Sequence, residues 1–249
     1  MHPPFPPLPQ AAAPLFVVSP HLDDAVFSCG ELLASRPGSI VCTVFCGEPA
    51  LPQRTSWDQS AGHCDSSVAI RSRMAEDERA LAIVGARAVR LSFLDSQYRE
   101  GVSPPTVDIA HALMHAWLQH GGAPLIAPLG LYHADHILVG DACRLLARRQ
   151  RLSHLVVYEE APYRRMKHVA SARLAALARE GCRCGPIDKE AGASLRRPGS
   201  ANAKWRAVHA YRSQLRAFGD AHPYDLREPE RYLHLVIDPP QRRRSSVPP

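Results

Sequence analysis

Strand-like and helix-like segments alternate along most of this chain, and this alternation restricts the fold more than any other feature of the sequence. The strand-like stretches are apolar and rich in β-branched residues, and they span residues 14–19, 39–46, 88–94, 124–129 and 154–158. Helix-like segments separate them, at residues 25–34, 68–85, 107–120 and 135–149. The succession predicts an α/β fold, a Rossmann-like three-layer sandwich whose mostly parallel sheet is covered by helices on both faces.

The C-terminal part of the chain has a different pattern. After Pro162 come two helix-like segments, at residues 169–180 and 200–218, and a late strand-like stretch at 232–237. Residues 181–200 are rich in Gly, Cys, Arg and Lys, and we expect a loop there. This part is therefore predicted to be smaller, helical and loop-rich.

A length of 249 residues fits one large domain, on the soft rule of roughly 150 residues per domain. We expect a single α/β domain over residues 15–237, with an irregular proline-rich arm at 1–14 and a flexible basic tail at 238–249. No apolar run approaches the roughly 20 residues of a membrane-spanning helix, and the N-terminus lacks the basic region of a secretory signal. These features predict a cytoplasmic protein without a membrane span.

The net charge of +6 is unevenly distributed along the chain. Residues 1–143 hold 8 Lys and Arg against 14 Asp and Glu, whereas residues 144–249 hold 22 against 10. A basic half can indicate an anionic partner or nucleic acid. Aromatic residues make up only 6%, which is few for the stacking platforms that bind nucleic-acid bases. A solvated arginine-rich surface is the favoured interpretation, with a basic anion- or nucleic-acid-binding protein that keeps a vestigial metal site as the alternative.

Metal-binding side chains gather directly after the first strand-like stretch. In an open parallel sheet, ligands bind beyond the carboxyl ends of the strands, where loops lead into helices. His21 and Asp24 lie in such a loop and can give two ligands to a divalent metal, with a histidine from elsewhere as the third. Asp23 lies between them and is free to act on water as a base. The alternative is that both aspartates only cap the following helix.

A second loop of the same kind follows the strand-like stretch at 124–129. It carries His133 and His136, with Asp135 between them. Either imidazole could complete the metal site, while Asp135 could orient the other. Two partly exposed surface histidines are the alternative, but two His-and-Asp loops at predicted strand ends together favour a metal site. The ligand types would also suit a non-haem iron oxygenase, which the neighbouring aspartate base argues against.

These loops resemble the two short motifs of the PIG-L/LmbE-like N-acetylglucosaminyl deacetylases. Residues 20–24, Pro-His-Leu-Asp-Asp, are similar to the family's Pro-His-Pro-Asp-Asp, and residues 133–136, His-Ala-Asp-His, are similar to its His-Pro-Asp-His. Leu22 and Ala134 replace the family's prolines, whereas the polar residues of both motifs are present. The resemblance runs from about residue 15 to about residue 215 and implies a metal-dependent amide hydrolase.

The resemblance also implies a role for each polar residue of the two motifs. It implies a Zn²⁺ ion, or another divalent metal such as Fe²⁺, held by His21, Asp24 and His136. It makes Asp23 the general base and His133 the group that stabilises the oxyanion or protonates the leaving amine. Asp135 would then hold His133 in the right tautomer.

The substrate that the resemblance implies is an N-acetyl amino sugar of the GlcNAc type, free or in a glycoconjugate. Asp95 stands where family members place a carboxylate against the sugar, and Arg73 matches an arginine of a family helix, so both are expected to bind substrate. Tyr132 is expected to face the carbonyl oxygen. A related zinc amidase that acts on a non-sugar amide, an antibiotic or a cysteine conjugate is the alternative. A homo-oligomer is compatible with the sequence.

Overall fold

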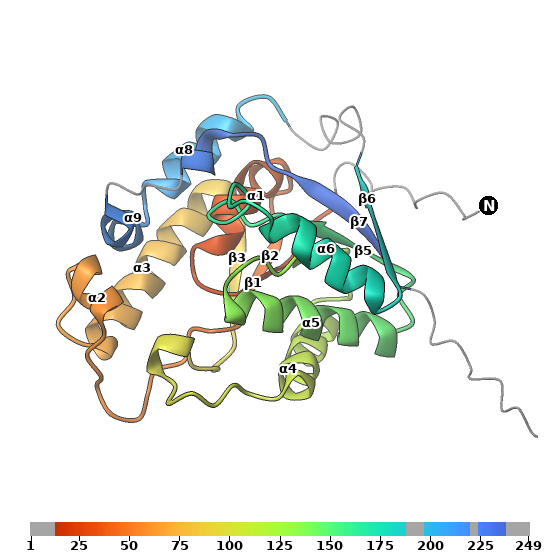
Figure 1. The fold of residues 1–249 in the computed structure, drawn as a ribbon. Helices are drawn as coiled ribbons and strands as arrows, with labels where there is room; N and C mark the ends of the chain where they lie inside the picture. The colour runs from red at the N-terminus through yellow and green to blue at the C-terminus, as the bar shows by residue number, and fades with distance from the viewer. Residues whose placement is uncertain (1–12, 188–196, 220–223, 238–249) are drawn as a thin grey trace, which may run out of the picture.

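The computed structural model describes residues 13–187, 197–219 and 224–237 (Figure 1). In this part of the chain a seven-stranded sheet forms the centre, with the strand order β3-β2-β1-β4-β5-β7-β6. The strands are β1 (Phe16–Ser19), β2 (Ile40–Thr43), β3 (Arg87–Arg90), β4 (Leu125–Pro128), β5 (His154–Tyr158), β6 (Cys182–Pro186) and β7 (Tyr232–Ile237).

The first five strands are parallel, and the order in which they are visited creates a break beside β1. The chain passes from β1 to β2 and β3 on one side, and then crosses to β4 on the other side of β1. Loops that leave β1 and β4 therefore turn to opposite faces of the sheet and leave a crevice between them, at the edge where doubly wound proteins bind ligands. β7 pairs antiparallel with both β5 and β6, and so ends the parallel part of the sheet.

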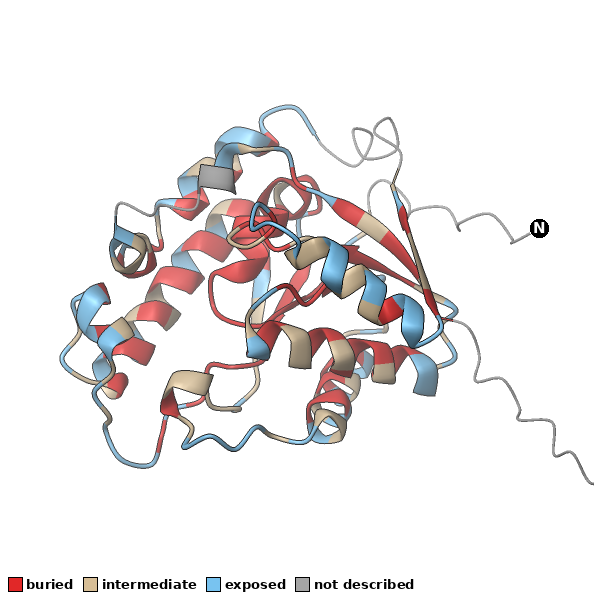
Figure 2. Ribbon diagram, viewed as in Figure 1, coloured by how far each residue is buried: buried red, intermediate tan, exposed pale blue. Residues whose placement is uncertain are grey.

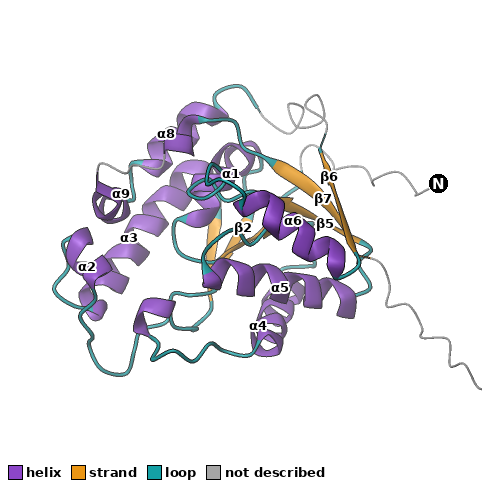
Figure 3. Cartoon of the chain, in the orientation of Figure 1, coloured by secondary structure: helices purple, strands orange, loops and turns teal. Residues whose placement is uncertain are grey.

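Helices cover both faces of the sheet, as the sequence predicted (Figure 3). Within the described ranges they are α1 (Asp24–Ser35), α2 (Ser56–Ala61), α3 (Ser66–Val84), α4 (Thr106–Gln119), α5 (Ala134–Arg149), α6 (Val169–Arg179), α8 (Ser200–Val208) and α9 (Arg212–Phe218), with short 3₁₀ turns η1 (Ser96–Tyr98) and η3 (Tyr224–Arg227). The long helix α3 ends at Gly85, whose positive φ of 71° is the left-handed conformation of a helix C-cap.

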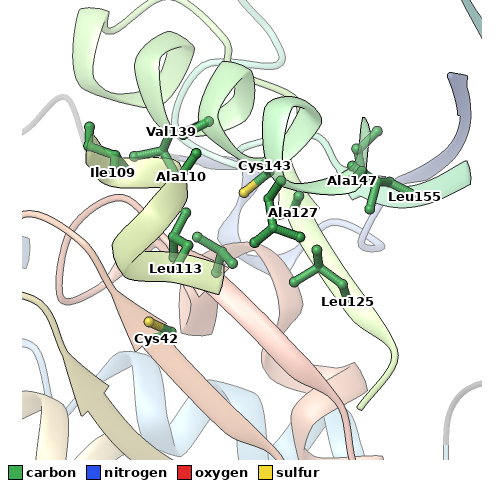
Figure 4. Packing of buried hydrophobic residues seen from close by; sticks show 14 of the residues in the cluster. Cys42, Ile109, Ala110, Leu113, Leu125, Ala127, Val139, Cys143, Ala147 and Leu155 are labelled. Atoms are coloured by element: carbon green, nitrogen blue, oxygen red, sulfur yellow. The ribbon is translucent and has the colours of Figure 1, made fainter. Parts of the chain in front are cut away.

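Two hydrophobic clusters hold the layers together. In β1, Phe16 and Val18 point to the cluster under α4, α5 and α6, whereas Val17 points to the cluster under α1, α3 and α8. Figure 4 shows α4 and α5 packing on the strands through side chains such as Leu113 and Cys143. Because both faces are covered, β1 and β4 are buried along their whole length, whereas exposed residues lie on the outer helix faces and in loops (Figure 2).

The structure corrects the sequence prediction in the C-terminal part. We expected a loop over 181–200, but Cys182–Pro186 form β6, whose residues pair with β7 from Cys182 opposite Ile237 to Pro186 opposite Leu233. This pairing is long-range in sequence, so no local pattern announces it. The predicted helix at 200–218 is two helices, because Tyr211 leaves helical geometry with a ψ of 59°. Helix α2 was not predicted.

Several sequence predictions fall outside the described residues. These are most of the N-terminal arm, the tail at 238–249, and the middle of the predicted loop, at 188–196. Among the described helices, none combines the length and the apolar composition that crossing a bilayer requires. The cytoplasmic location and the oligomeric state stay predictions.

Candidate metal centre and active site

The two His-and-Asp loops lie next to each other, because β1 and β4 are neighbours in the strand order. β1 and β4 are neighbouring parallel strands, and the loops leave their carboxyl ends at the same edge of the sheet. Together with segments that follow β2, β3 and β5, and with α9, they line a cavity of about 320 Å³. The cavity is lined by His21, Asp23, Asp24, Trp57, Arg73, Asp95, Ser96, Gln97, His133, Pro162, Tyr163, Gln214 and Phe218.

Three of the predicted ligands converge on one point. His21, Asp24 and His136 each offer a ligand atom, and these atoms all lie within 4.8 Å of one another. Asp24 Oδ2 lies 3.2 Å from His21 Nδ1 and 3.1 Å from His136 Nε2. The same oxygen accepts a hydrogen bond from the backbone N–H of His21, at 2.9 Å, so the loop itself fixes the carboxylate. All three side chains are buried.

His136 has the environment of a metal-ligating histidine. Its Nδ1 lies 3.2 Å from Glu160 Oε1, which also accepts hydrogen bonds from the backbone N–H groups of Gly130 and Leu131. Its Nε2 is buried beside Asp24 without a hydrogen bond. A carboxylate behind one ring nitrogen, with the other nitrogen aimed at further ligands, is how proteins orient a histidine towards a metal. The donor set of two imidazoles and one carboxylate therefore fits a divalent cation.

The charges at this point favour a cation. Burial alone would raise the pKa of Asp24, but the facing rings of His136 and His21 hold it well below its usual value. Burial would lower the pKa of His136, yet Asp24 and Glu160 outweigh that effect and raise it to about 9. The cluster therefore takes up positive charge in the form of protons, and a metal ion that binds here displaces them.

Asp23 lies next to the cluster and does not serve as a helix cap. It occupies the N-cap position of α1, but its side chain makes no capping hydrogen bond. The interpretation of both aspartates as caps therefore does not hold for Asp23. The carboxylate lines the cavity, and burial together with the neighbouring Asp24 raises the pKa of Asp23 to about 6. A carboxylate with such a pKa is ionised at neutral pH and is a better base than an exposed one.

The structure assigns His133 and Asp135 different partners from those predicted. His133 Nδ1 accepts a hydrogen bond from the backbone N–H of Asp135, at 3.2 Å, as the cap of α5. The Asp135 carboxylate lies against His21 Nε2, at 3.2 Å, and also accepts from the Ser96 backbone and the Arg99 guanidinium. The hydrogen bond to His133 thus comes from the backbone of Asp135, whereas its carboxylate bonds to His21, Ser96 and Arg99.

The bond to Nδ1 has a consequence for the proton on His133. A neutral ring whose Nδ1 accepts carries its proton on Nε2. Burial, and after it the charges of His21 and His136, lower the pKa of His133, so the neutral ring dominates at neutral pH. His133 therefore presents an N–H donor to the cavity.

Of the three residues expected to bind substrate, Arg73 and Asp95 line the cavity, while Tyr132 does not. Arg73 Nη1 lies 3.6 Å from Asp95 Oδ2, which lies 3.8 Å from His21 Nε2. Asp95 is held by its role as the cap of η1, where it accepts from the backbone N–H of Gln97. Tyr132 is 60% exposed and is not among the lining residues, and its ring instead contacts Tyr163, which lines the cavity.

Sequence reasoning missed several residues of the site. Glu160 follows β5 as His133 follows β4, so the rule that ligands bind at strand ends could have selected it. Arg99, which pairs with Asp135, lies in the loop after β3 and carries no such signal. Trp57 and Phe218 reach the cavity from α2 and α9. They lie 161 residues apart in the sequence, and no local pattern connects them.

Comparison with known families agrees with these observations. A sequence model of the PIG-L family, described as GlcNAc-PI de-N-acetylase, matches residues 16–147. That range is just over half of the chain and contains both His-and-Asp loops. Among curated proteins, none matches the sequence.

Several solved structures with a similar fold are deacetylases. The zinc-inhibited form of teicoplanin deacetylase has a TM-score of 0.70 and 20% identity, over 92% of this chain and 100% of its own. The deacetylase of the A40926 pseudoaglycone has a TM-score of 0.64 and 23% identity, over 90% and 96%. The N,N'-diacetylchitobiose deacetylase of Pyrococcus horikoshii has a TM-score of 0.58 and 15% identity, over 92% and 85%. At these identities the likeness establishes the fold.

Proposed function

This chain belongs to the PIG-L family of N-deacetylases, and we propose that it removes the N-acetyl group of a GlcNAc-type amino sugar, free or in a glycoconjugate. The reaction breaks the amide C–N bond and forms a C–O bond to the carbon of the acetyl group. Water supplies the oxygen, and the products are acetate and a free amine. Three tasks follow for the protein: activating water, stabilising the charge on the carbonyl oxygen, and protonating the amine.

The proposed metal is Zn²⁺, held by His21, Asp24 and His136. Support comes from the convergence of their ligand atoms and from the unbonded, buried Nε2 of His136. Three protein ligands of these types are usual for catalytic zinc. When bound, such an ion polarises the amide carbonyl and lowers the pKa of water.

Asp23 is the proposed general base. Its carboxylate lines the cavity beside Asp24 and makes no capping bond that would hold it away from the reacting atoms. With a pKa of about 6 it is ionised at neutral pH and accepts the proton of the attacking water. The protonated carboxyl then returns this proton to the amide nitrogen, so that the amine leaves neutral.

His133 is the proposed donor to the carbonyl oxygen. Because the backbone N–H of Asp135 bonds to Nδ1, the proton of the neutral ring is on Nε2 and can be donated as negative charge develops on that oxygen. Since its pKa is lowered, His133 is a weak source of a full proton at neutral pH. The role of general acid therefore falls to Asp23.

Arg73 and Asp95 are the proposed sugar-binding pair. They are buried, lie 3.6 Å apart and present both hydrogen-bond donors and acceptors to one side of the cavity. Sugar hydroxyls both donate and accept, so a guanidinium beside a carboxylate can bind two of them and position the N-acetyl group.

The observation that carries the proposal is the convergence of two imidazoles and a carboxylate, with a second carboxylate beside them. They meet in a cavity at the break in strand order beside β1. The test is acetate release, measured on N-acetylglucosamine, its methyl glycoside, N,N'-diacetylchitobiose and the non-sugar amide N-acetylcysteine. We expect release from the sugars, loss of activity on chelation, and recovery with Zn²⁺. Added metal is limited to one equivalent, because one similar fold was solved in a zinc-inhibited form.

Two results would overturn the proposal. Activity that survives complete removal of metal would exclude the metal mechanism. Release from N-acetylcysteine alone would replace the sugar by a non-sugar amide while keeping the mechanism.

A further inference from the structure

One side of the cavity is aromatic and comes from outside the catalytic loops. Trp57 of α2 and Phe218 of α9 both line it, with ring centroids 5.3 Å apart and ring planes at 82°. Both side chains are only half-buried, so part of each ring is open. We call this pair the aromatic wall.

A chain of hydrogen bonds fixes the Trp57 side chain of the aromatic wall. Trp57 Nε1 donates to Gln214 Oε1, at 3.2 Å, and Gln214 Nε2 donates to Ser213 Oγ, at 3.1 Å. The Ser213 hydroxyl in turn donates to Glu76 Oε2, at 2.6 Å. The one polar atom of the indole is therefore already used, and the wall offers carbon surface alone.

Helix α2 is also fixed to the other side of the cavity. Thr55 caps α2 by accepting from the Asp58 backbone N–H, and its hydroxyl donates to Gln97 Oε1, at 2.7 Å. Asp58 is buried and accepts from the Tyr98 hydroxyl. Since Gln97 and Tyr98 belong to the 3₁₀ turn beside Asp95, the aromatic wall keeps a set position relative to the sugar-binding side.

The two sides of the cavity suit different parts of a substrate. An amino sugar carries hydroxyl groups around its ring, and Arg73, Asp95 and Gln97 can bind them, whereas the aromatic wall cannot. Two rings at nearly a right angle form a corner that offers one ring face and one ring edge. A flat aromatic group can enter such a corner in offset-stacked and edge-to-face contact at once.

We propose that the natural substrate is an N-acetyl amino sugar with an aromatic aglycone, and that Trp57 and Phe218 bind this aglycone. The inference rests on the proposed deacetylase function and adds the class of group beyond the sugar. One methylene group more or less in an apolar pocket changes kcat/KM by roughly 10- to 200-fold, so the effect of a phenyl group is measurable.

The experiment compares acetate release from the phenyl and the methyl β-glycosides of N-acetylglucosamine. For the intact protein we expect kcat/KM to be at least about tenfold higher with the phenyl glycoside, mainly through KM. In Trp57→Ala and Phe218→Ala kcat/KM should fall at least about tenfold further for the phenyl glycoside than for the methyl glycoside, so that the preference disappears. Phe218→Leu, which keeps an apolar side chain, should retain part of the preference.

Trp205→Ala is the matched control, because Trp205 is also half-buried in a helix but contacts Arg227 and His209 away from the cavity. It should leave the preference intact. The melting temperature of each variant shows whether it folds.

The possible outcomes distinguish a failure of this inference from a failure of the proposed deacetylase function. Equal kcat/KM for both glycosides in the intact protein overturns the inference and leaves the deacetylase function standing. An equal loss for both glycosides in Trp57→Ala also overturns it, because the indole then stacks on the sugar itself. A preference for N-hexanoyl over N-acetyl substrates that Trp57→Ala removes would assign the wall to the acyl group instead. Release from neither glycoside overturns the proposed function and the inference with it.

Discussion

The two sides of the cavity are built in different ways. The polar side consists mainly of charged groups that follow β1, β3 and β4 directly, and Arg73 reaches it from α3. Apart from the half-buried His133 these groups are buried, and several are fixed by hydrogen bonds to nearby backbone. The aromatic wall comes from two short helices, α2 and α9, and its rings are only half-buried.

The difference follows from the demands of each task. A metal and a base must be held to within fractions of an ångström, and strand ends in a packed sheet provide that rigidity. An aglycone needs apolar surface of roughly the right shape. Short helices at the periphery can supply this surface, and their side chains can vary without changing the sheet. We therefore expect changes on the polar side to act on metal content and kcat, and changes on the aromatic wall to act on KM.

The largest effect is expected for His21→Ala. This change removes a proposed ligand together with its contacts to Asp24 and Asp135. Metal affinity should fall by more than the roughly 10- to 100-fold that removal of an outer partner costs, and acetate release should be lost with it. Elemental analysis of the purified variant measures the metal. His115→Ala, on the exposed face of α4, is the control. Full metal occupancy in His21→Ala would refute the ligand set.

Asp23→Asn separates the chemistry from metal binding. The amide has nearly the same shape as the carboxylate but cannot accept a proton, so kcat should fall by about 10²- to 10⁴-fold while the metal stays bound. Rate and metal content are measured on the same sample, beside the exposed Asp108→Asn. Activity within tenfold of the unchanged protein would mean that another group serves as the base.

Glu160→Gln tests the support behind His136. The amide oxygen can still accept from the backbone N–H groups of Gly130 and Leu131, but the charge facing His136 Nδ1 is gone. Metal affinity should fall by roughly 10- to 100-fold, as measured by competition with a chelator. The neighbouring Glu159→Gln, which loses only an ion pair with Arg231, should not alter it. An unchanged metal affinity in Glu160→Gln would show that this carboxylate serves only to hold the loop at Gly130 and Leu131 through hydrogen bonds to its backbone.

The sequence indicates where the polar side lies, because its position depends on short-range patterns. Apolar β-branched stretches locate β1 and β4, and the rule that ligands gather at the carboxyl ends of parallel strands then selects the loops with His21 and His136. Only the order of the strands was needed to bring these loops together, and the succession of strands and helices restricts that order strongly.

The sequence could not predict the partners of single side chains or the contacts between elements that are distant in sequence. Asp135 was expected to orient His133 through its carboxylate, but the helix start directs that carboxylate to His21 and leaves the backbone to His133. Strand β6 exists because β7 lies beside it, and Trp57 meets Phe218 because two separate helices pack together. Such contacts depend on the tertiary fold and not on local composition.

The smallest effect is expected for Tyr132→Phe, which tests whether Tyr132 belongs to the polar side of the cavity. The sequence places Tyr132 at the carbonyl oxygen, yet its side chain is exposed and contacts Tyr163 instead of lining the cavity. Loss of a true oxyanion donor costs on the order of 10²- to 10³-fold in kcat, whereas a hydroxyl in solvent costs less than about twofold. The measured kcat decides between these two ranges. A hundredfold loss would mean that the loop after β4 closes over the substrate and brings the hydroxyl in, and donation to the oxygen would then be shared between Tyr132 and His133.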